Sequence, residues 1–150
     1  MNPEKSFVFA GPLSTEFIPD WFFKTDNIYT TGRLDYAELP AVLKGFDIAM
    51  IPFRKDQVSN TIFPLKLFEY LGAGKPVIST DFNTDLKSFT KGTVQFCSNS
   101  KAFSESINHE LHTNSHEKID QRIAVSEENT WKRRAAEFSE LLRLQLDRKL

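Results

Sequence analysis

Several features are scarce in this chain, and each scarcity excludes a class of protein. The single cysteine, Cys97, cannot form a disulfide within the chain, which excludes the disulfide framework of a small secreted domain. Cys97 lies in an apolar, strand-like run, so we expect an inert buried thiol. No apolar run approaches the ~20 residues that a membrane-spanning helix needs, and the first residues, MNPEKSF, lack the apolar core of a signal peptide. We therefore expect a cytoplasmic protein.

The chain also lacks an excess of either positive or negative charge. The chain has 19 basic and 20 acidic residues and a net charge of −1, which offers nothing for non-specific nucleic-acid binding. His109, His112 and His116 lie close together, but no cysteine or carboxylate completes a metal-ligand set. We expect a polar helix surface there and no metal site.

Three common motifs are missing as well. The chain has neither the glycine fingerprint of a nicotinamide-binding fold nor a P-loop. Asp47 precedes a buried strand, as a receiver-domain phosphorylation site would. A receiver also needs paired acidic residues at the end of its first strand, where this chain has Ala10-Gly11-Pro12. These absences exclude a nicotinamide-dependent dehydrogenase, a P-loop protein and a receiver domain.

The residues that are present describe an ordinary globular chain. Its 150 residues are 40% hydrophobic and 26% charged, which permits one compact domain with a sizeable core. Apolar strand patterns alternate with helical ones, which predicts an α/β, doubly wound parallel sheet covered on both sides. We expect a single domain over residues 1–150, with a sheet core in about 1–100 and a helical part in 101–150. The expected strands are 7–10, 28–31, 47–52, 77–80 and 93–97; the expected helices are 17–23, 36–44, 64–73, 101–112, 117–125 and 128–148.

The last expected helix has an amphipathic pattern. Trp131, Ala135, Phe138 and Leu142 recur at helical spacing. The pattern predicts that this helix docks one face on the domain.

Residues 64–80, PLKLFEYLGAGKPVIST, are the most informative segment. Pro64 suits a first helical turn, and Gly74 suits the left-handed residue that ends a helix. Pro76 then forbids further helix, and an apolar β-branched run begins. Glu69 and Lys66 fall away from the apolar face of the helix, which is formed by Leu67, Phe68, Leu71 and Gly72. A carboxylate on the first turns of a helix that follows a polar loop could grip an anionic ligand with hydroxyl groups.

This segment resembles the signature of the nucleotide-sugar-binding half of GT-B glycosyltransferases, the retaining "group 1" (family 4) class. One branch carries a pattern close to P-x-K-x-x-E-Y-L-x-x-G-K-P-V-V, which the chain matches at residues 64, 66, 69–71 and 74–77. Residues 27–53 are similar to the family's strand, Y-x-x-L-P helix and following strand, and residues 128–135 to its closing Trp helix start. The resemblance covers nearly all of the chain and implies a Rossmann-like donor-binding domain, one half of a GT-B architecture.

The resemblance also implies where the donor binds. Ligands of open parallel sheets bind at the carboxyl ends of strands, and Gly11, Arg33 and Arg54 follow the first three expected strands. The helix start beside Ile62 and Phe63 suits a diphosphate, with Lys66, Arg33 or Arg54 as auxiliary cations. Glu69 corresponds to the second glutamate of the family's Glu-x7-Glu motif, which accepts hydrogen bonds from the ribose hydroxyls. The alternative is a solvated helix glutamate paired with Lys66.

One position departs from the family pattern. Where the first glutamate of the motif would stand, eight residues before Glu69, the chain has Thr61. A threonine can hydrogen-bond a sugar hydroxyl but supplies no negative charge at the anomeric centre. Thr61 is therefore a candidate sugar contact, and the catalytic residue stays unassigned.

A complete GT-B enzyme has a second, N-terminal domain that binds the acceptor. The family's usual opening strand and helix also have no counterpart before Phe7, so the resemblance implies a fragment or one half of a split enzyme. The implied partners are a nucleotide-sugar donor, with no cofactor besides it, and an N-terminal domain or partner chain that could provide peripheral membrane contact. Because the family's terminal helix crosses to that domain, Trp131, Phe138 and residues 141–146 would expose apolar surface here and allow self-association.

Two functions remain open from the sequence. The first is the donor half of a glycosyltransferase that transfers sugar from a nucleoside diphosphate-sugar to a hydroxyl acceptor, in polysaccharide or glycoconjugate biosynthesis. This half would be inactive without its acceptor domain. The second is a non-catalytic nucleotide-binding or partner-binding module of the same fold.

Overall fold

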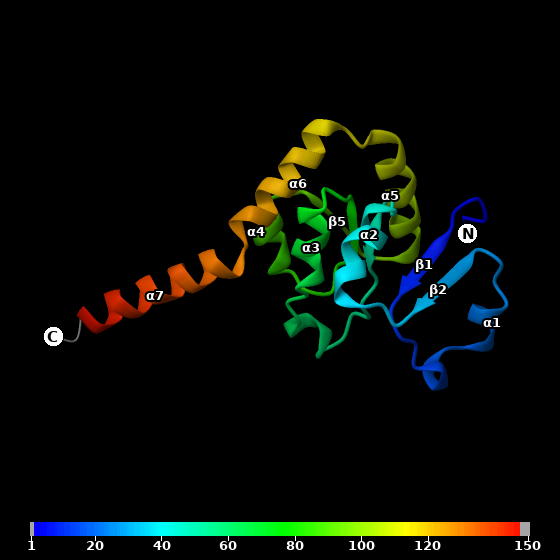
Figure 1. Cartoon of the computed structure of the whole chain (residues 1–150), viewed down its shortest axis with the longest axis horizontal. Coiled ribbons are helices and arrows are strands. Elements are labelled where there is room, and N and C mark those ends of the chain that lie inside the picture. Colours follow the sequence, from blue (N-terminus) through cyan, green and yellow to red (C-terminus); the bar gives the residue numbers. More distant parts are fainter. Residues whose placement is uncertain (1, 148–150) are drawn as a thin grey trace. The chain divides into compact units, whose positions relative to one another are not determined.

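A computed structural model describes residues 2–147, and these belong to two compact units, Met1–Gly45 and Phe46–Leu150. Each unit combines parallel strands with helices (Figure 1), so the predicted α/β, Rossmann-like fold class is confirmed. The described strands form a sheet of two and a sheet of three, where the sequence predicted one sheet. A single domain over residues 1–150 stays a prediction, and the two units are described separately.

The first unit is built on two parallel strands. Strand β1 (Phe7–Ala10) pairs with β2 (Ile28–Gly32), with Phe7 opposite Ile28. Phe22 is buried and packs edge-on against Phe9, with ring centroids 4.9 Å apart. The remaining elements of this unit are η1 (Thr15–Phe17), α1 (Asp20–Phe23), η2 (Tyr36–Glu38) and α2 (Leu39–Lys44).

The second unit contains a three-stranded parallel sheet in the order β3-β4-β5. Its strands are β3 (Ala49–Ile51), β4 (Val77–Thr80) and β5 (Val94–Cys97), and its helices are η3 (Ser59–Thr61), α3 (Lys66–Gly72), α4 (Leu86–Thr90), α5 (Ser100–Thr113), α6 (His116–Glu128) and α7 (Trp131–Asp147). The core joins the sheet to α3 and α6 through Ile51, Leu67, Leu71, Val77, Phe82, Leu86, Val94 and Val125. Cys97 is buried, as predicted.

Helix α3 ends as the sequence predicts. Gly74 has a φ of +69°, its N–H donates to the carbonyl of Leu71 (2.9 Å), and the N–H of Lys75 donates to the carbonyl of Tyr70 (3.0 Å). These two bonds define a Schellman cap, which satisfies the last carbonyls of the helix. The cap turns the chain directly into the buried strand β4.

Two glycines allow α3 to approach α6 closely. A Cβ at Gly72 would lie 2.8 Å from Oγ of Ser126, and a Cβ at Gly74 would lie 2.8 Å from Cγ2 of Ile119. The Ser126 hydroxyl donates to the carbonyl of Phe68 (2.9 Å), which ties the two helices together. Gly72 and Gly74 therefore both serve helix packing, and Gly74 also serves the turn.

A buried ion pair connects α5, α6 and the end of α3. Arg122 and Glu110 are each 3% exposed, and Nη2 of Arg122 lies 3.1 Å from Oε2 of Glu110. Arg122 Nη1 also donates to the carbonyl of Gly74 (3.1 Å) and to Oδ1 of Asn114 (2.8 Å), and Gln95 donates to Glu110 (3.0 Å). Burial lowers the pKa of Arg122, an effect that the charge of Glu110 opposes, but a guanidinium stays protonated at neutral pH. This network was not predicted from the sequence.

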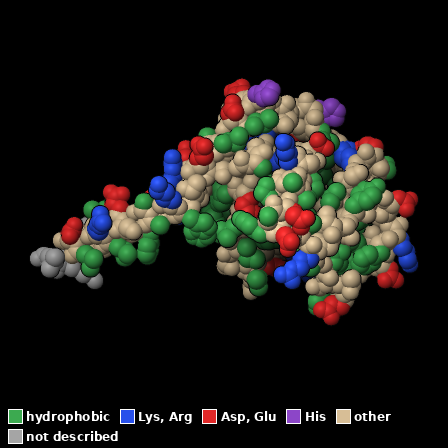
Figure 2. Space-filling model, in the orientation of Figure 1, with side chains coloured by type: hydrophobic (Ala, Val, Ile, Leu, Met, Phe, Trp, Pro, Cys, Tyr) green, Lys and Arg blue, Asp and Glu red, His purple; other side chains and the backbone are tan. Residues whose placement is uncertain are grey.

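Helix α7 contradicts the predicted docking of its apolar face. None of its described residues is buried: Trp131 is 74% exposed, Phe138 63% and Leu142 49%. Hydrophobic side chains gather along one side of this helix (Figure 2), and nothing in the described residues covers them. The amphipathic period identified the apolar face correctly, but the docking was wrong. This exposure matches the apolar surface that the resemblance implied.

Two further findings concern the helices. Helix α4 (Leu86–Thr90) was not predicted; it is anchored by the fully buried side chains of Leu86 and Thr90. Among the described residues, no helix combines the length and the apolar character needed to cross a membrane.

Candidate functional site

The loop that leads into α3 is held by a short reciprocal turn. The N–H of Ser59 donates to Oδ1 of Asp56 (2.8 Å), and the N–H of Asp56 donates to Oγ of Ser59 (3.0 Å). The Ser59 hydroxyl, which is buried, also donates to the carbonyl of Arg54. Hydrogen bonds from Ser59 lower the pKa of the Asp56 carboxyl, so this carboxylate stays charged to lower pH than an ordinary aspartate and is protonated only as the pH falls through that lowered pKa.

The loop ends at the start of α3 with backbone donors available. Asn83, which is 7% exposed, donates from Nδ2 to the carbonyl of Ile62 (3.1 Å), and the N–H of Leu67 donates to the carbonyl of Pro64 (3.0 Å). Within the described part of the chain, no acceptor is recorded for the N–H groups of Phe63, Leu65 and Lys66. These amides lie where the sequence predicted the diphosphate. Asn83 was not predicted, because it lies far along the chain from the loop that it holds.

Glu69 lies one turn into α3 and is exposed. No salt bridge or hydrogen bond of its carboxylate is recorded among the described residues. Lys66, the partner in the alternative reading, instead places Nζ 5.0 Å from the ring centroid of Phe53. Burial, and secondarily the charge of Glu69, raise the pKa of the neighbouring Tyr70. The Glu69 carboxylate is therefore available to a ligand.

Thr61 and Arg54 flank the same loop. Thr61 is exposed, and its hydroxyl donates to the carbonyl of Val58 (2.9 Å), which leaves its oxygen able to accept from a ligand. The Arg54 side chain is exposed, and its charge contributes to the lowered pKa of Asp56. The second unit thus carries six of the predicted site residues on one loop and the helix after it, namely Arg54, Thr61, Ile62, Phe63, Lys66 and Glu69.

Gly11 and Arg33 belong to the first unit. Gly11 has a φ of +129°, and its N–H donates to Oγ1 of Thr31 (3.2 Å) beside the end of β2. Arg33 follows β2 directly and is exposed. Both residues lie at the carboxyl ends of the two parallel strands, as predicted, and their part in donor binding stays a prediction.

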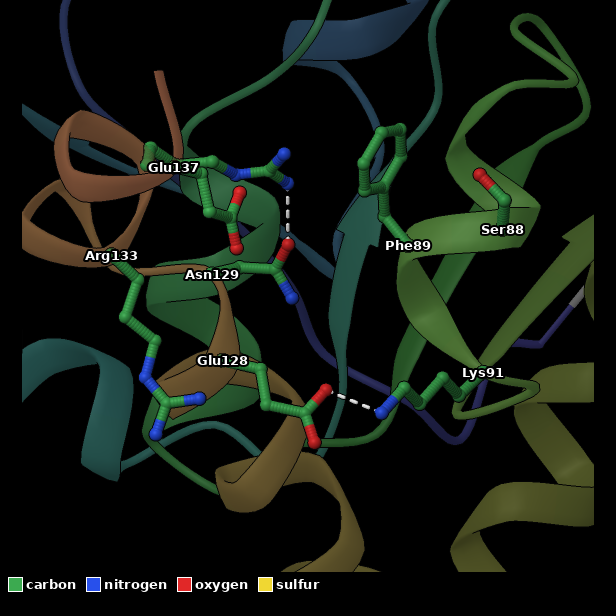
Figure 3. A pocket seen from close by; sticks show the side chains of 8 residues that line it. Ser88, Phe89, Lys91, Glu128, Asn129, Arg133 and Glu137 are labelled. Carbon is green, nitrogen blue, oxygen red and sulfur yellow. Dashed lines mark hydrogen bonds and ion pairs between the residues drawn. The ribbon is translucent and has the colours of Figure 1, made fainter. Parts of the chain in front are cut away.

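The second unit also has an open pocket of about 370 Å³ that contains none of the predicted residues. Residues of α4 face the end of α6 and the first turns of α7 across it (Figure 3), and Lys91 pairs there with Glu128. Its lining residues are Ser88, Phe89, Lys91, Glu128, Asn129, Arg133, Arg134 and Glu137. The charges in this pocket are mixed and partly paired with one another.

The histidines are placed as surface residues of helices. His109 and His112 lie on α5 and are exposed, and Nδ1 of His112 lies 2.7 Å from the carbonyl oxygen of Asn108. His116 begins α6. In the region that the structure describes, no cluster of three histidine, cysteine or acidic side chains could hold a metal ion.

Comparison with known proteins agrees with the family resemblance of the signature segment. Residues 1–140 match the model of a family described as glycosyl transferase-like. A Bacillus subtilis (strain 168) protein named as a teichuronic acid biosynthesis glycosyltransferase, TuaH, is 33% identical over 88 residues. That match covers 57% of this chain but 22% of the relative, so the chain spans about a fifth of the relative's length. No solved structure matches the chain. The predicted family is confirmed: the chain belongs to the glycosyl transferase-like family and is a GT-B-type glycosyltransferase domain.

Proposed function

We propose that this chain is the donor-binding half of a glycosyltransferase that transfers a sugar from a nucleoside diphosphate-sugar to a hydroxyl acceptor. The observation that carries the proposal is the exposed Glu69 carboxylate, which has no recorded partner among the described residues. It lies one turn beyond a loop whose amides have no recorded acceptor. The Bacillus subtilis relative is named for teichuronic acid biosynthesis, which supports a role in polysaccharide biosynthesis.

Each part of the donor has a proposed contact. The ribose hydroxyls donate to the two oxygens of Glu69, and the diphosphate accepts from the amides at the start of α3. Lys66 and Arg54 lie on the same segment and add positive charge. Thr61 contacts the transferred sugar. We propose no metal or cofactor besides the donor, because backbone amides can hydrogen-bond the diphosphate and the cations can offset its charge.

Replacing Glu69 with glutamine tests the proposal. We expect the variant to bind nucleoside diphosphates more weakly by about 1.5–3 kcal/mol, or about tenfold to 140-fold, because the acceptor loses its negative charge and one of its two accepting oxygens. The Glu69 side chain is exposed, so the free energy of unfolding should change by less than about 0.5 kcal/mol. Titration calorimetry with UDP, GDP, ADP, CDP and dTDP measures the affinities.

The control for this titration is Glu140→Gln, which removes the charge of another exposed glutamate, on α7. It should bind as the unchanged chain does. In the unchanged chain, amide chemical shifts on nucleotide addition should move most in Ser59–Leu65, and a monophosphate should bind more weakly than its diphosphate. Equal affinities of the Glu69→Gln and unchanged chains would contradict the ribose role.

Catalysis by this chain is proposed to need a second domain. GT-B transfer takes place between two domains that exclude water and bring the acceptor hydroxyl to the anomeric carbon. We expect the purified chain to give no multiple-turnover transfer alone, and transfer to appear when a partner carrying the acceptor domain is added. A radiolabelled-sugar transfer assay with and without that partner measures this. Sustained transfer by the chain alone would contradict the proposal. Nucleotide binding without transfer, both with and without the partner, would favour a non-catalytic module. The presence of Thr61 in place of a glutamate leaves that alternative open.

A further inference from the structure

The first turns of α7 contact the loop that leads into α3. Cζ of Arg134 lies 4.6 Å from the ring centroid of Phe89 on α4 and 5.8 Å from that of Phe63 in the loop. The two rings meet edge-on, with centroids 5.2 Å apart. One guanidinium therefore lies over two aromatic rings from segments that are distant in the sequence, a geometry in which cation and ring attract each other.

Arg134 is itself held in place. Its Nη2 donates to Oδ1 of Asn129 (2.5 Å), and Nδ2 of Asn129 donates to the carbonyl of Val125 (2.7 Å). Val125 is 4% exposed and belongs to the core of the second unit. The position of the guanidinium is thus fixed by the end of α6, which is anchored in the core.

Phe63 is the residue through which this anchoring reaches the loop. Its ring is held on one side by Phe89 and stacks on Phe68 of α3, with centroids 5.6 Å apart. The chain on either side of it is also fixed, by the bond from Asn83 to the carbonyl of Ile62 and by the buried Pro64. The direction of the Phe63 ring therefore helps to set the direction of the amides that begin α3.

We propose that Arg134 is a positioning residue for donor binding: through the rings of Phe89 and Phe63 it orders the loop Ser59–Leu65 in the conformation that accepts a nucleoside diphosphate. The proposal rests on the proposed function for the nature of the ligand. Arg134 touches no donor and acts only through these two rings. Because such coupling is reciprocal, nucleotide binding must also shift the signals of the first turns of α7.

The test compares Arg134→Ala with Arg133→Ala. Both variants lose one positive charge from the same turn of α7, but Arg133 has no recorded contact with an aromatic ring among the described residues. We expect Arg134→Ala to bind the tightest of the five diphosphates about threefold to tenfold more weakly, the size that the loss of a cation–π coupling would give, and Arg133→Ala to bind it unchanged. Arg134→Lys keeps a cation over the rings and should recover part of the affinity.

A second measurement is independent of any ligand. In the free protein, ring-proton shifts of Phe63 and backbone relaxation of residues 62–65 should change in Arg134→Ala and not in Arg133→Ala, and circular dichroism should show that both variants remain folded. If these spectra do not change, the positioning role is wrong even if nucleotide binds at Glu69. If the loop loosens but affinity is unchanged, the link to donor binding is wrong. If the unchanged chain binds no diphosphate, both the proposed function and the link between Arg134 and donor binding are wrong. The spectra of the free protein still decide whether Arg134 orders the loop.

Discussion

Replacing Arg122 with alanine is expected to lower the free energy of unfolding by about 3–5 kcal/mol, because it deprives a buried carboxylate of its main counter-charge. Arg122 and Glu110 are each 3% exposed, and without the guanidinium the Glu110 carboxylate keeps Gln95 and the more distant Lys118 (3.8 Å). The carbonyl of Gly74 and the side chain of Asn114 would also lose a donor. Urea denaturation followed by circular dichroism measures the loss.

The loss from Arg122→Ala is large beside the about 5–15 kcal/mol that stabilise a typical domain, so a double variant provides a second test. In Glu110→Gln/Arg122→Met both charges are gone, and the double variant should be more stable than the sum of its two single changes predicts. Arg133→Ala, which truncates an exposed arginine, should change the free energy of unfolding by less than about 0.5 kcal/mol. A change that small in Arg122→Ala would show that the buried pair is dispensable.

Replacing Gly74 with alanine is expected to lower the free energy of unfolding by about 2–4 kcal/mol, because strain in a left-handed backbone adds to overpacking. The φ of Gly74 is +69°, and the added Cβ would lie 2.8 Å from Cγ2 of Ile119. That methyl group is attached directly to the Cβ of Ile119, so it cannot swing away without a change of rotamer in α6.

Gly92 offers a matched control for this substitution. Its φ is +79°, but a Cβ there would meet nothing within 4 Å. Gly92→Ala should therefore cost only the backbone strain, about 1–2 kcal/mol. Thermal and urea unfolding of the two variants separate strain from close packing, and equal losses at Gly74 and Gly92 would contradict the packing role of Gly74.

The parts of the fold that sequence analysis predicted well are those where local chemistry leaves few choices. Gly74 ends α3 and Pro76 prevents further helix before β4, and both elements form as predicted. Helix α4 was missed because it has five residues, and its Asp85 N-cap makes no capping bond. Two buried side chains, Leu86 and Thr90, hold it, and burial of that kind depends on the folded structure more than on a local pattern.

The polar network and the terminal helix show two other limits of sequence reasoning. Glu110 and Arg122 lie on different helices, and in the sequence they look like any pair of surface charges. In α7 the spacing of Trp131 and Phe138 predicts an apolar face, but periodicity says nothing about what covers that face. A contact between residues that are distant in the sequence, such as Asn83 and Ile62, cannot be predicted from a local pattern either.

The proposed contact of Glu69 and the start of α3 with a nucleoside diphosphate can be seen in a crystal structure. The chain is crystallised with the diphosphate that binds it most tightly. We expect the ribose hydroxyls within hydrogen-bonding distance of the Glu69 carboxylate and the diphosphate beside the amides of Phe63, Leu65 and Lys66. A nucleotide bound elsewhere, for example in the pocket beside Phe89 and Arg133, with Glu69 left free in solvent, would contradict it.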